Sequence, residues 1–286
     1  MVLRSLAAAL LVLLVVVGLP AAAQPPTPNA DLTAGNNQFA FDLYQTVAST
    51  NADNFLFSPF SVSQALAMTY AGARGNTETQ MADVLHFTLP QTELHAAFNA
   101  LTTNLNQRSQ TAVDGMSGQR FQLSMVNALW GQAGFAFKPD FTALLEQNYG
   151  AGIRETDFAS DPEAARQTIN DWVAEQTQDK IKDIVPPDSI TADTSLVLAN
   201  AIYFLASWLS PFNEADTQAG PFTLVDGSTV TVPMMQQTES FAYASGTGYQ
   251  AIELPYLGGD VSMVIVLPDA GNYANFEATV NAETFA

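Results

Sequence analysis

The spacing of apolar residues predicts several helices in the first two thirds of the chain. Phe39 and Leu43 fall on one face of the segment from about residue 36 to residue 49, which is the pattern of an amphipathic helix. Thr77 and Gln80 have the spacing of a capping box, which predicts a helix that starts at Thr77. Helical spacing also recurs after Pro90, from Pro139 and from Asp161.

A more apolar helix is expected to begin at Ser58, after a short predicted strand over residues 54–57. The Ser hydroxyl can accept a hydrogen bond from a free N–H of the first helical turn, and Pro59 has no N–H at a position where the helix cannot use one. The positions from Phe60 to Tyr70 are apolar nearly all round. A helix of this composition belongs inside a large domain.

Strand patterns dominate the later part of the chain. They cover residues 121–130, 153–158, 196–206, 220–235 with a turn at Asp226-Gly227, 249–256 and 261–269. Residues 196–206 are apolar on both faces except at Asn200, which suits a strand that is covered from both sides. A buried amide without a partner costs about 1 to 3 kcal/mol, so we expect Asn200 to be hydrogen-bonded.

The first 23 residues have the layout of a cleaved signal peptide. Arg4 precedes an apolar run over residues 6–17, and residues 21–23 are all Ala. A membrane anchor is the alternative, but the run is short for a spanning helix. We therefore expect cleavage after about Ala23, secretion and no remaining membrane attachment. The Pro-rich start of residues 24–35 predicts a flexible lead, and residues 36–286 are expected to form one domain.

Charge and cysteine content narrow the range of functions. The chain has 28 acidic and 9 basic residues and a net charge of −19, so its surface repels the phosphate backbone of nucleic acids. Cysteine is absent, so neither disulfides nor thiol chemistry can support the fold or an activity. We expect no nucleic-acid partner.

The sequence also lacks the residue patterns of common enzymes. There is no G-x-S-x-G motif, and the only histidines are His86 and His95. Together with Glu93 they could be considered as metal ligands, but they lack the H-E-x-x-H spacing that places two His on one helical face. No glycine motif for phosphate binding is present. We therefore expect neither an enzyme nor a bound metal or cofactor.

Two distant segments carry distinctive patterns: residues 54–81 (NFLFSPFSVSQALAMTYAGARGNTETQM) and residues 196–208 (LVLANAIYFLASW). Both resemble signature stretches of the serpin family of protease inhibitors. Pro211 and Phe212 complete a W-x-x-P-F run of that family, and residues 220–235 (GPFTLVDGSTVTVPMM) are similar to one of its hairpins. The resemblance covers most of the chain after the signal. It implies an α+β fold, with helices packed around large mixed or antiparallel β-sheets, that is incomplete at the C-terminus.

The resemblance also assigns candidate site residues. Ser58, Ser61 and Asn200 match the polar cluster called the shutter, and Trp208 matches the Trp of the breach, where the reactive loop first enters the main sheet. The family's shutter also uses a His from the C-terminal part, and neither His of this chain stands in a matching position. Alone, each of these residues is typical of an ordinary core. Their joint match, in order, favours the functional interpretation.

In inhibitory serpins a protease cuts an exposed loop, which then inserts as a new strand while the protease is still covalently attached. The resemblance therefore implies an inhibitor of serine, or cysteine, proteases, and the expected signal peptide implies that it is secreted and acts on extracellular ones. The reactive-site bond lies beyond Ala286, so the chain as given is expected to be non-inhibitory. The helix that binds heparin in several serpins has no Lys or Arg here until Arg108, so no heparin binding is expected. The alternative is a non-inhibitory binding or structural protein with the same fold.

Overall fold

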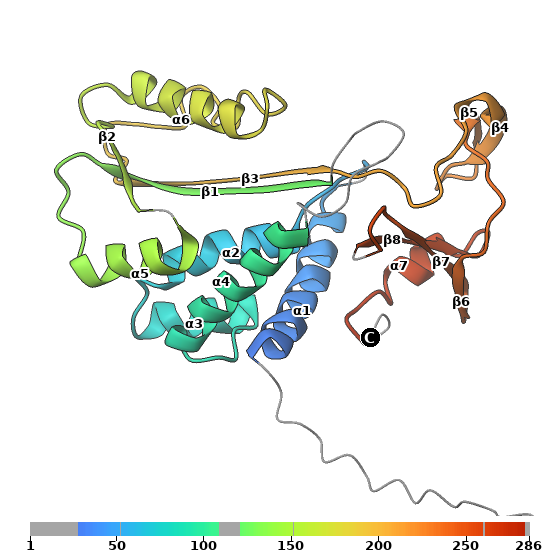
Figure 1. The fold of residues 1–286 in the computed structure, drawn as a ribbon, viewed down its shortest axis with the longest axis horizontal. Coiled ribbons are helices and arrows are strands. Elements are labelled where there is room, and N and C mark those ends of the chain that lie inside the picture. Colours follow the sequence, from blue (N-terminus) through green and yellow to red (C-terminus); the bar gives the residue numbers. More distant parts are fainter. Residues whose placement is uncertain (1–27, 52, 109–120, 151, 260, 284–286) are drawn as a thin grey trace, which may run out of the picture.

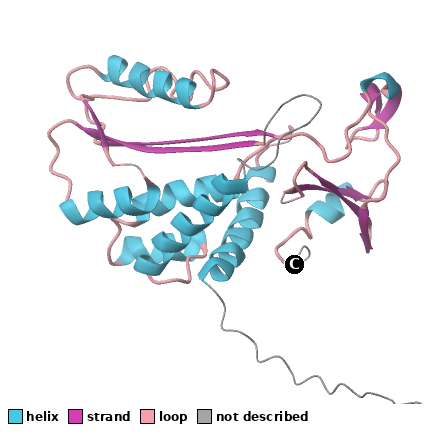
Figure 2. Ribbon diagram, in the orientation of Figure 1, coloured by secondary structure: helices cyan, strands magenta, loops and turns pink. Residues whose placement is uncertain are grey.

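The computed structural model describes residues 28–51, 53–108, 121–150, 152–259 and 261–283. Figure 1 shows a long pair of strands, β1 and β3, with α6 on one side and the helices α1 to α5 on the other. The short β2 lies at one end of this pair, and β4 to β8 lie at the other end, as Figures 1 and 2 show. The expected signal peptide and residues 24–27 lie outside the described residues. Nowhere in the described ranges is a helix both long and apolar enough to cross a bilayer.

The first helix is longer than the sequence pattern predicted. α1 runs from Pro28 to Ala48, so residues 28–35 are helical where a flexible lead was expected. Leu32 is only 3% exposed and packs in the same apolar cluster as Phe39. Leu32 precedes Phe39 by seven residues, two helical turns, and this burial stabilises the additional turns.

The helix α2 (Pro59–Tyr70) begins as the sequence predicted. The Ser58 side chain accepts a hydrogen bond from the N–H of Ser61, and most of the helix is buried. The expected strand over residues 54–57 is not formed, because no strand of the described part pairs with it.

The next two helices, α3 and α4, pack with α1 and α2. α3 (Asn76–Leu85) starts one residue earlier than predicted, with Gly75 as its N-cap and no side-chain cap, so the capping box expected at Thr77 is wrong. At Gly75 the backbone φ is +60°, a conformation that glycine adopts without strain. α4 (Gln91–Arg108) follows. An apolar cluster that includes the fully buried Phe98 joins α1, α2, α3 and α4.

The central sheet has three strands in the order β2-β1-β3. β1 (Gln122–Gln132) pairs in antiparallel fashion with β3 (Leu196–Leu205) over ten residues, and in parallel with the short β2 (Arg154–Thr156). α5 (Pro139–Tyr149) connects β1 to β2, and α6 (Pro162–Gln176) connects β2 to β3. The parallel connection therefore runs through a helix, as expected for such a pair.

Each face of this sheet contributes to a different core. Trp130 and Val126 of β1 pack with Ile169 of α6. On the opposite face, Leu129 packs with Met68 of α2 and with α5. The alternation of side chains along β1 thus builds both layers.

On the side away from β1, β3 pairs with no strand among the described residues. The expectation that this strand is covered from both sides holds only along its middle. Ala199 and Ala201 are buried, whereas Leu196 is 37% and Phe204 43% exposed. β3 is therefore an edge strand in this structure.

The C-terminal region adds two small sheets. After a 3₁₀ turn, Glu214–Asp216, β4 (Gln218–Thr223) and β5 (Thr229–Met234) form the predicted hairpin. β6 (Ala242–Gly246), β7 (Tyr249–Pro255) and β8 (Ser262–Pro268) form an antiparallel sheet, followed by α7 (Tyr273–Glu277). The hydroxyl of Tyr44 in α1 donates a 2.7 Å hydrogen bond to Oε1 of Glu277. This bond connects the C-terminal region to the first helix.

Candidate functional site

The structure brings together the three residues that the sequence analysis assigned to the shutter. Asn200, in the middle of β3, donates from Nδ2 to the carbonyl oxygen of Ser61 at 3.1 Å and to its Oγ at 2.6 Å. Ser61 lies in the first turn of α2 and is 1% exposed. Its own N–H donates to Oγ of Ser58 at 3.3 Å. The start of α2 is therefore hydrogen-bonded directly to the central strand.

Three further residues that the sequence analysis did not single out extend this group. Asn127 of β1 stands directly opposite Asn200 in the strand register and accepts a short hydrogen bond from its Nδ2. Asn127 Nδ2 donates to Oε1 of Gln64 at 2.8 Å, and Gln64 Nε2 donates to Oγ1 of Thr102 in α4 at 2.7 Å. We call these six residues the polar cluster: Ser58, Ser61, Gln64, Thr102, Asn127 and Asn200.

A sequence signal for two of these residues was available. Asn127 interrupts the apolar run of residues 125–130, much as Asn200 interrupts its strand, and Gln64 interrupts an almost wholly apolar helix. Gln64 is 3% exposed, and a side-chain amide at such a position needs partners. Thr102 gave no comparable signal, since a Thr is common on a half-exposed helix face.

The polar cluster is suited to holding strands in place rather than to catalysis. Its members are hydroxyls and amides, none of which is ionised at neutral pH. The Asn127–Asn200 bond links the two long strands side chain to side chain, in addition to their backbone ladder. The bonds to Ser61 and Gln64 fix both strands to α2. Separation of β3 from β1 or from α2 would leave buried amide and hydroxyl groups without partners, which makes the cluster a lock on the sheet.

Trp208, the predicted breach residue, lies just after β3 and contacts the end of β7. Its ring stacks on that of Tyr256 with centroids 4.4 Å apart and planes 12° apart. The two residues also form an isolated antiparallel bridge, supported by the bond from the Leu209 N–H to the carbonyl of Pro255. Phe204 of β3 packs edge-on against Tyr256 at 5.2 Å. Trp208 therefore joins the end of the central sheet to the C-terminal sheet.

The two histidines lie outside the polar cluster and serve other contacts. His86 Nε2 is 2.7 Å from Oδ2 of Asp42 in α1. His95 is fully buried in α4, with Nδ1 2.6 Å from the hydroxyl of Tyr149. Burial, with a smaller contribution from the cationic Arg74, lowers the pKa of His95 to about 4. In the part of the chain that the structure describes, no three His, Cys, Asp or Glu residues gather as a metal site.

Residues 34–286 match the protein family described as serpin (serine protease inhibitor). Among curated proteins, the leukocyte elastase inhibitor of Sus scrofa is 40% identical over 242 residues, which cover 84% of this chain and 61% of that protein. An uncharacterized serpin-like protein of Thermococcus kodakarensis is 40% identical over 246 residues, with 86% and 55% coverage. The chain thus spans about three fifths of the length of the curated relatives it matches.

Solved structures agree with the sequence matches. Ovalbumin from emu, Dromaius novaehollandiae, superimposes with a TM-score of 0.80 at 28% identity, over 89% of this chain and 68% of that one. The native stressed conformation of Arabidopsis AtSerpin1 gives 0.78 at 27% identity, over 92% and 67%. The α+β fold inferred from the sequence is that of these proteins. The chain belongs to the serpin family.

Proposed function

We propose that this protein, in its full-length form, inhibits serine proteases by inserting a cleaved loop as a new strand beside β3. The observation that supports this most directly is the edge of β3 that no strand among the described residues covers, next to a cluster that locks the same strand to α2. An edge strand offers unpaired N–H and C=O groups to an added strand. The identity with leukocyte elastase inhibitors supports a serine protease as the partner.

In this mechanism the polar cluster is the shutter and Trp208 the breach. The residues Ser61 and Asn200 hold β3 closed against α2 until insertion begins. Trp208 and Tyr256 lie at the end of β3 where the C-terminal sheet meets it. The first insertion contacts would form at that end, and the remaining ones would follow along β3 past Asn200. The free energy of the added strand would then distort the attached protease.

We further propose that residues 1–286 alone do not inhibit. They provide β3 and the polar cluster, but among the described residues no element corresponds to the segment that would be cut and inserted. The enzyme partner would act on that segment and not on the polar cluster, which has no nucleophile paired with a base. The protein itself would not be an enzyme.

Secretion is part of the proposal and rests on the layout of residues 1–23. Cleavage after about Ala23 would release a chain that begins at Gln24. The first helix of this chain starts at Pro28 and leads into the domain formed by residues 36–286. N-terminal sequencing of the product from culture medium tests this. A product that keeps Arg4, or that stays with the cells, contradicts export.

The test of inhibition uses the longest natural product and pancreatic elastase. We expect a complex that survives boiling in dodecyl sulfate, because the protease stays covalently attached. Elastase whose active-site serine has been blocked with a sulfonyl fluoride is the matched control and should give no such complex. Complete cleavage of the protein with no loss of elastase activity, repeated with trypsin and chymotrypsin, would favour a non-inhibitory binding protein on this fold.

A further inference from the structure

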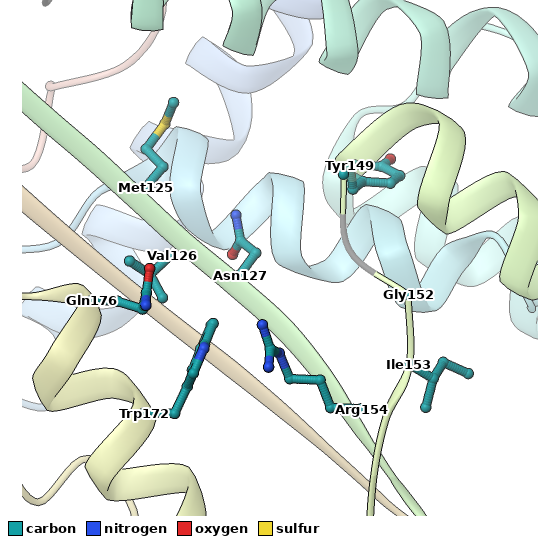
Figure 3. A pocket seen from close by; sticks show the side chains of 10 residues that line it. Met125, Val126, Asn127, Tyr149, Gly152, Ile153, Arg154, Trp172 and Gln176 are labelled. Carbon is teal, nitrogen blue, oxygen red and sulfur yellow. The ribbon is translucent and has the colours of Figure 1, made fainter.

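A cavity of about 380 Å³ lies at the edge of the central sheet, between β1, the end of α5 and the end of α6. This volume is at the lower end of the range for small-molecule sites. Figure 3 shows its lining side chains, with the guanidinium end of Arg154 pointing toward Asn127 and Trp172. Asn127 is the one lining residue that also belongs to the polar cluster, so the cavity is a separate feature.

Where β1 lines this cavity, it pairs with β3 on one side and has no partner strand among the described residues on the other. β2 pairs only with Trp130–Gln132 of β1, so Met125 and Asn127 have no strand beside them on that side in the described ranges. The N–H of Gln132 bonds toward β3, whereas that of Ala133 bonds to Thr156 on the β2 side. Because successive residues of a strand alternate in direction, the odd-numbered Met125 and Asn127 aim their N–H and C=O groups at the cavity.

Arg154 supplies a positive charge that is held in position. Its Cζ lies 4.7 Å from the centroid of the Trp172 ring and 5.6 Å from that of Trp130. The two indoles pack edge to face at 5.8 Å, so they form a fixed aromatic corner for the guanidinium. The ion pairs found among the described residues involve Asp42 with His86 and Glu163 with Arg166, so Arg154 has no carboxylate partner there.

That Arg154 has no carboxylate partner among the described residues suggests that it is free to bind a ligand. Acidic residues outnumber basic ones 28 to 9, so an arginine meets nearby carboxylates easily. A guanidinium that is stacked on aromatic rings keeps its in-plane N–H groups available, and their fork matches a carboxylate in two-point geometry. The exposed amide of Gln176 and the free N–H groups of β1 add further donors around the same space. Trp172, Val126 and Ile153 provide apolar walls.

We propose that this cavity binds a small carboxylate that carries an apolar ring. The carboxylate pairs with Arg154, and the ring lies against Trp172. Neutral analogues of the same shape lose the charge-assisted pair and bind more weakly. The site is independent of the proposed protease inhibition, since no part of it lies on the free edge of β3.

The test is a titration of the purified full chain, labelled with ¹⁵N, with phenylacetate and with phenylacetamide as its neutral match. The chain has three tryptophans, so their indole N–H signals can be followed individually. We expect phenylacetate to shift the signals of Trp130 and Trp172 but not that of Trp208. The affinity for phenylacetamide should be lower by a factor of about ten or more, since a hydrogen bond to a charged group is lost.

Variants of Arg154 test whether this residue binds the carboxylate. Arg154→Gln should weaken phenylacetate binding about tenfold or more. The affinity of Arg154→Lys should lie between those of Arg154→Gln and the unaltered protein, because Lys keeps the charge but not the two-point geometry of the guanidinium. Lys138→Gln removes an exposed cation outside the cavity and should change nothing. Equal affinity for acid and amide, unchanged affinity in Arg154→Gln, or no saturable binding at millimolar phenylacetate would each overturn the proposal.

Discussion

Replacement of Asn200 by Ala should destabilise the fold through the polar cluster. The change removes bonds from Nδ2 to two atoms of Ser61 and to Oδ1 of Asn127. Ser61 is 1% exposed, so water does not replace the lost donor freely. An unsatisfied buried polar group costs about 1 to 3 kcal/mol, and we expect the free energy of unfolding to fall by that amount.

Asn200→Asp sharpens this prediction. Asp has nearly the same shape, but a carboxylate would place acceptor oxygens against the acceptors of Ser61 and Asn127. Its loss of stability should therefore exceed that of Asn200→Ala. Asn275→Ala, at an exposed position of α7, is the control and should stay within about 0.5 kcal/mol of the unaltered protein.

Urea unfolding followed by far-ultraviolet circular dichroism measures all of these variants. The midpoint and slope of each curve give the free energy of unfolding by linear extrapolation. If Asn200→Ala and Asn275→Ala unfold at the same urea concentration, the cluster does not hold the sheet, and the reasoning is refuted. If Asn200→Asp is as stable as the unaltered protein, the direction assigned to the hydrogen bonds is wrong.

Four further outcomes are expected. Gln64→Leu and Asn200→Ala should show a coupling of about 0.5 kcal/mol or more in a double-mutant cycle, because Asn127 bonds to both; strict additivity contradicts the cluster. Ser58→Ala should lower stability by about 1 kcal/mol through loss of the helix cap, and an unchanged midpoint argues against it. Phe98→Ala should cost about 3 to 5 kcal/mol, since Phe98 is fully buried; a loss under 1 kcal/mol would mean that this core is loosely packed. Stability should fall, by up to about 3 kcal/mol, as the pH drops from about 6.5 to 4, and His95→Gln should flatten this slope.

The sign of the pH effect follows from the buried histidine. Burial lowers the pKa of His95 to about 4, so the folded protein keeps this ring neutral while the unfolded chain takes up a proton below about 6.5. Unfolding therefore gains protons between these two values, and acid favours the unfolded state there. Below about pH 4 the ring is protonated in both states and contributes no further slope. A curve that rises toward acid pH would contradict this account.

Local patterns in the sequence predicted most elements of the fold. The Ser58 cap, the strand that carries Asn200 and the hairpin at Asp226-Gly227 depend on neighbouring residues, and each is found where it was expected. The Thr77 capping box was also a local inference and was wrong, because the helix starts at Asn76 after Gly75. The early start of α1 depends on burial of Leu32 in a core built by several helices, which a local pattern does not contain.

The candidate site was only partly accessible from the sequence. The resemblance supplied Ser61 and Asn200, and the structure shows that they are hydrogen-bonded. The position of Asn127 opposite Asn200 is set by the register of two strands that are some seventy residues apart in sequence. The stacking of Trp208 on Tyr256 has a similar origin. Such pairings follow from tertiary packing and have no local signature.

Thermal unfolding of the longest natural product, before and after limited cleavage by elastase, tests the central claim most directly. If the cut segment inserts beside β3, the cleaved protein should unfold at a clearly higher temperature than the intact one, because the free edge gains a full ladder of hydrogen bonds. Asn200→Asp should lower the unfolding temperature of the intact form. If cleavage leaves the unfolding temperature unchanged or lowers it, no strand has been added, and the proposed inhibition by loop insertion is contradicted.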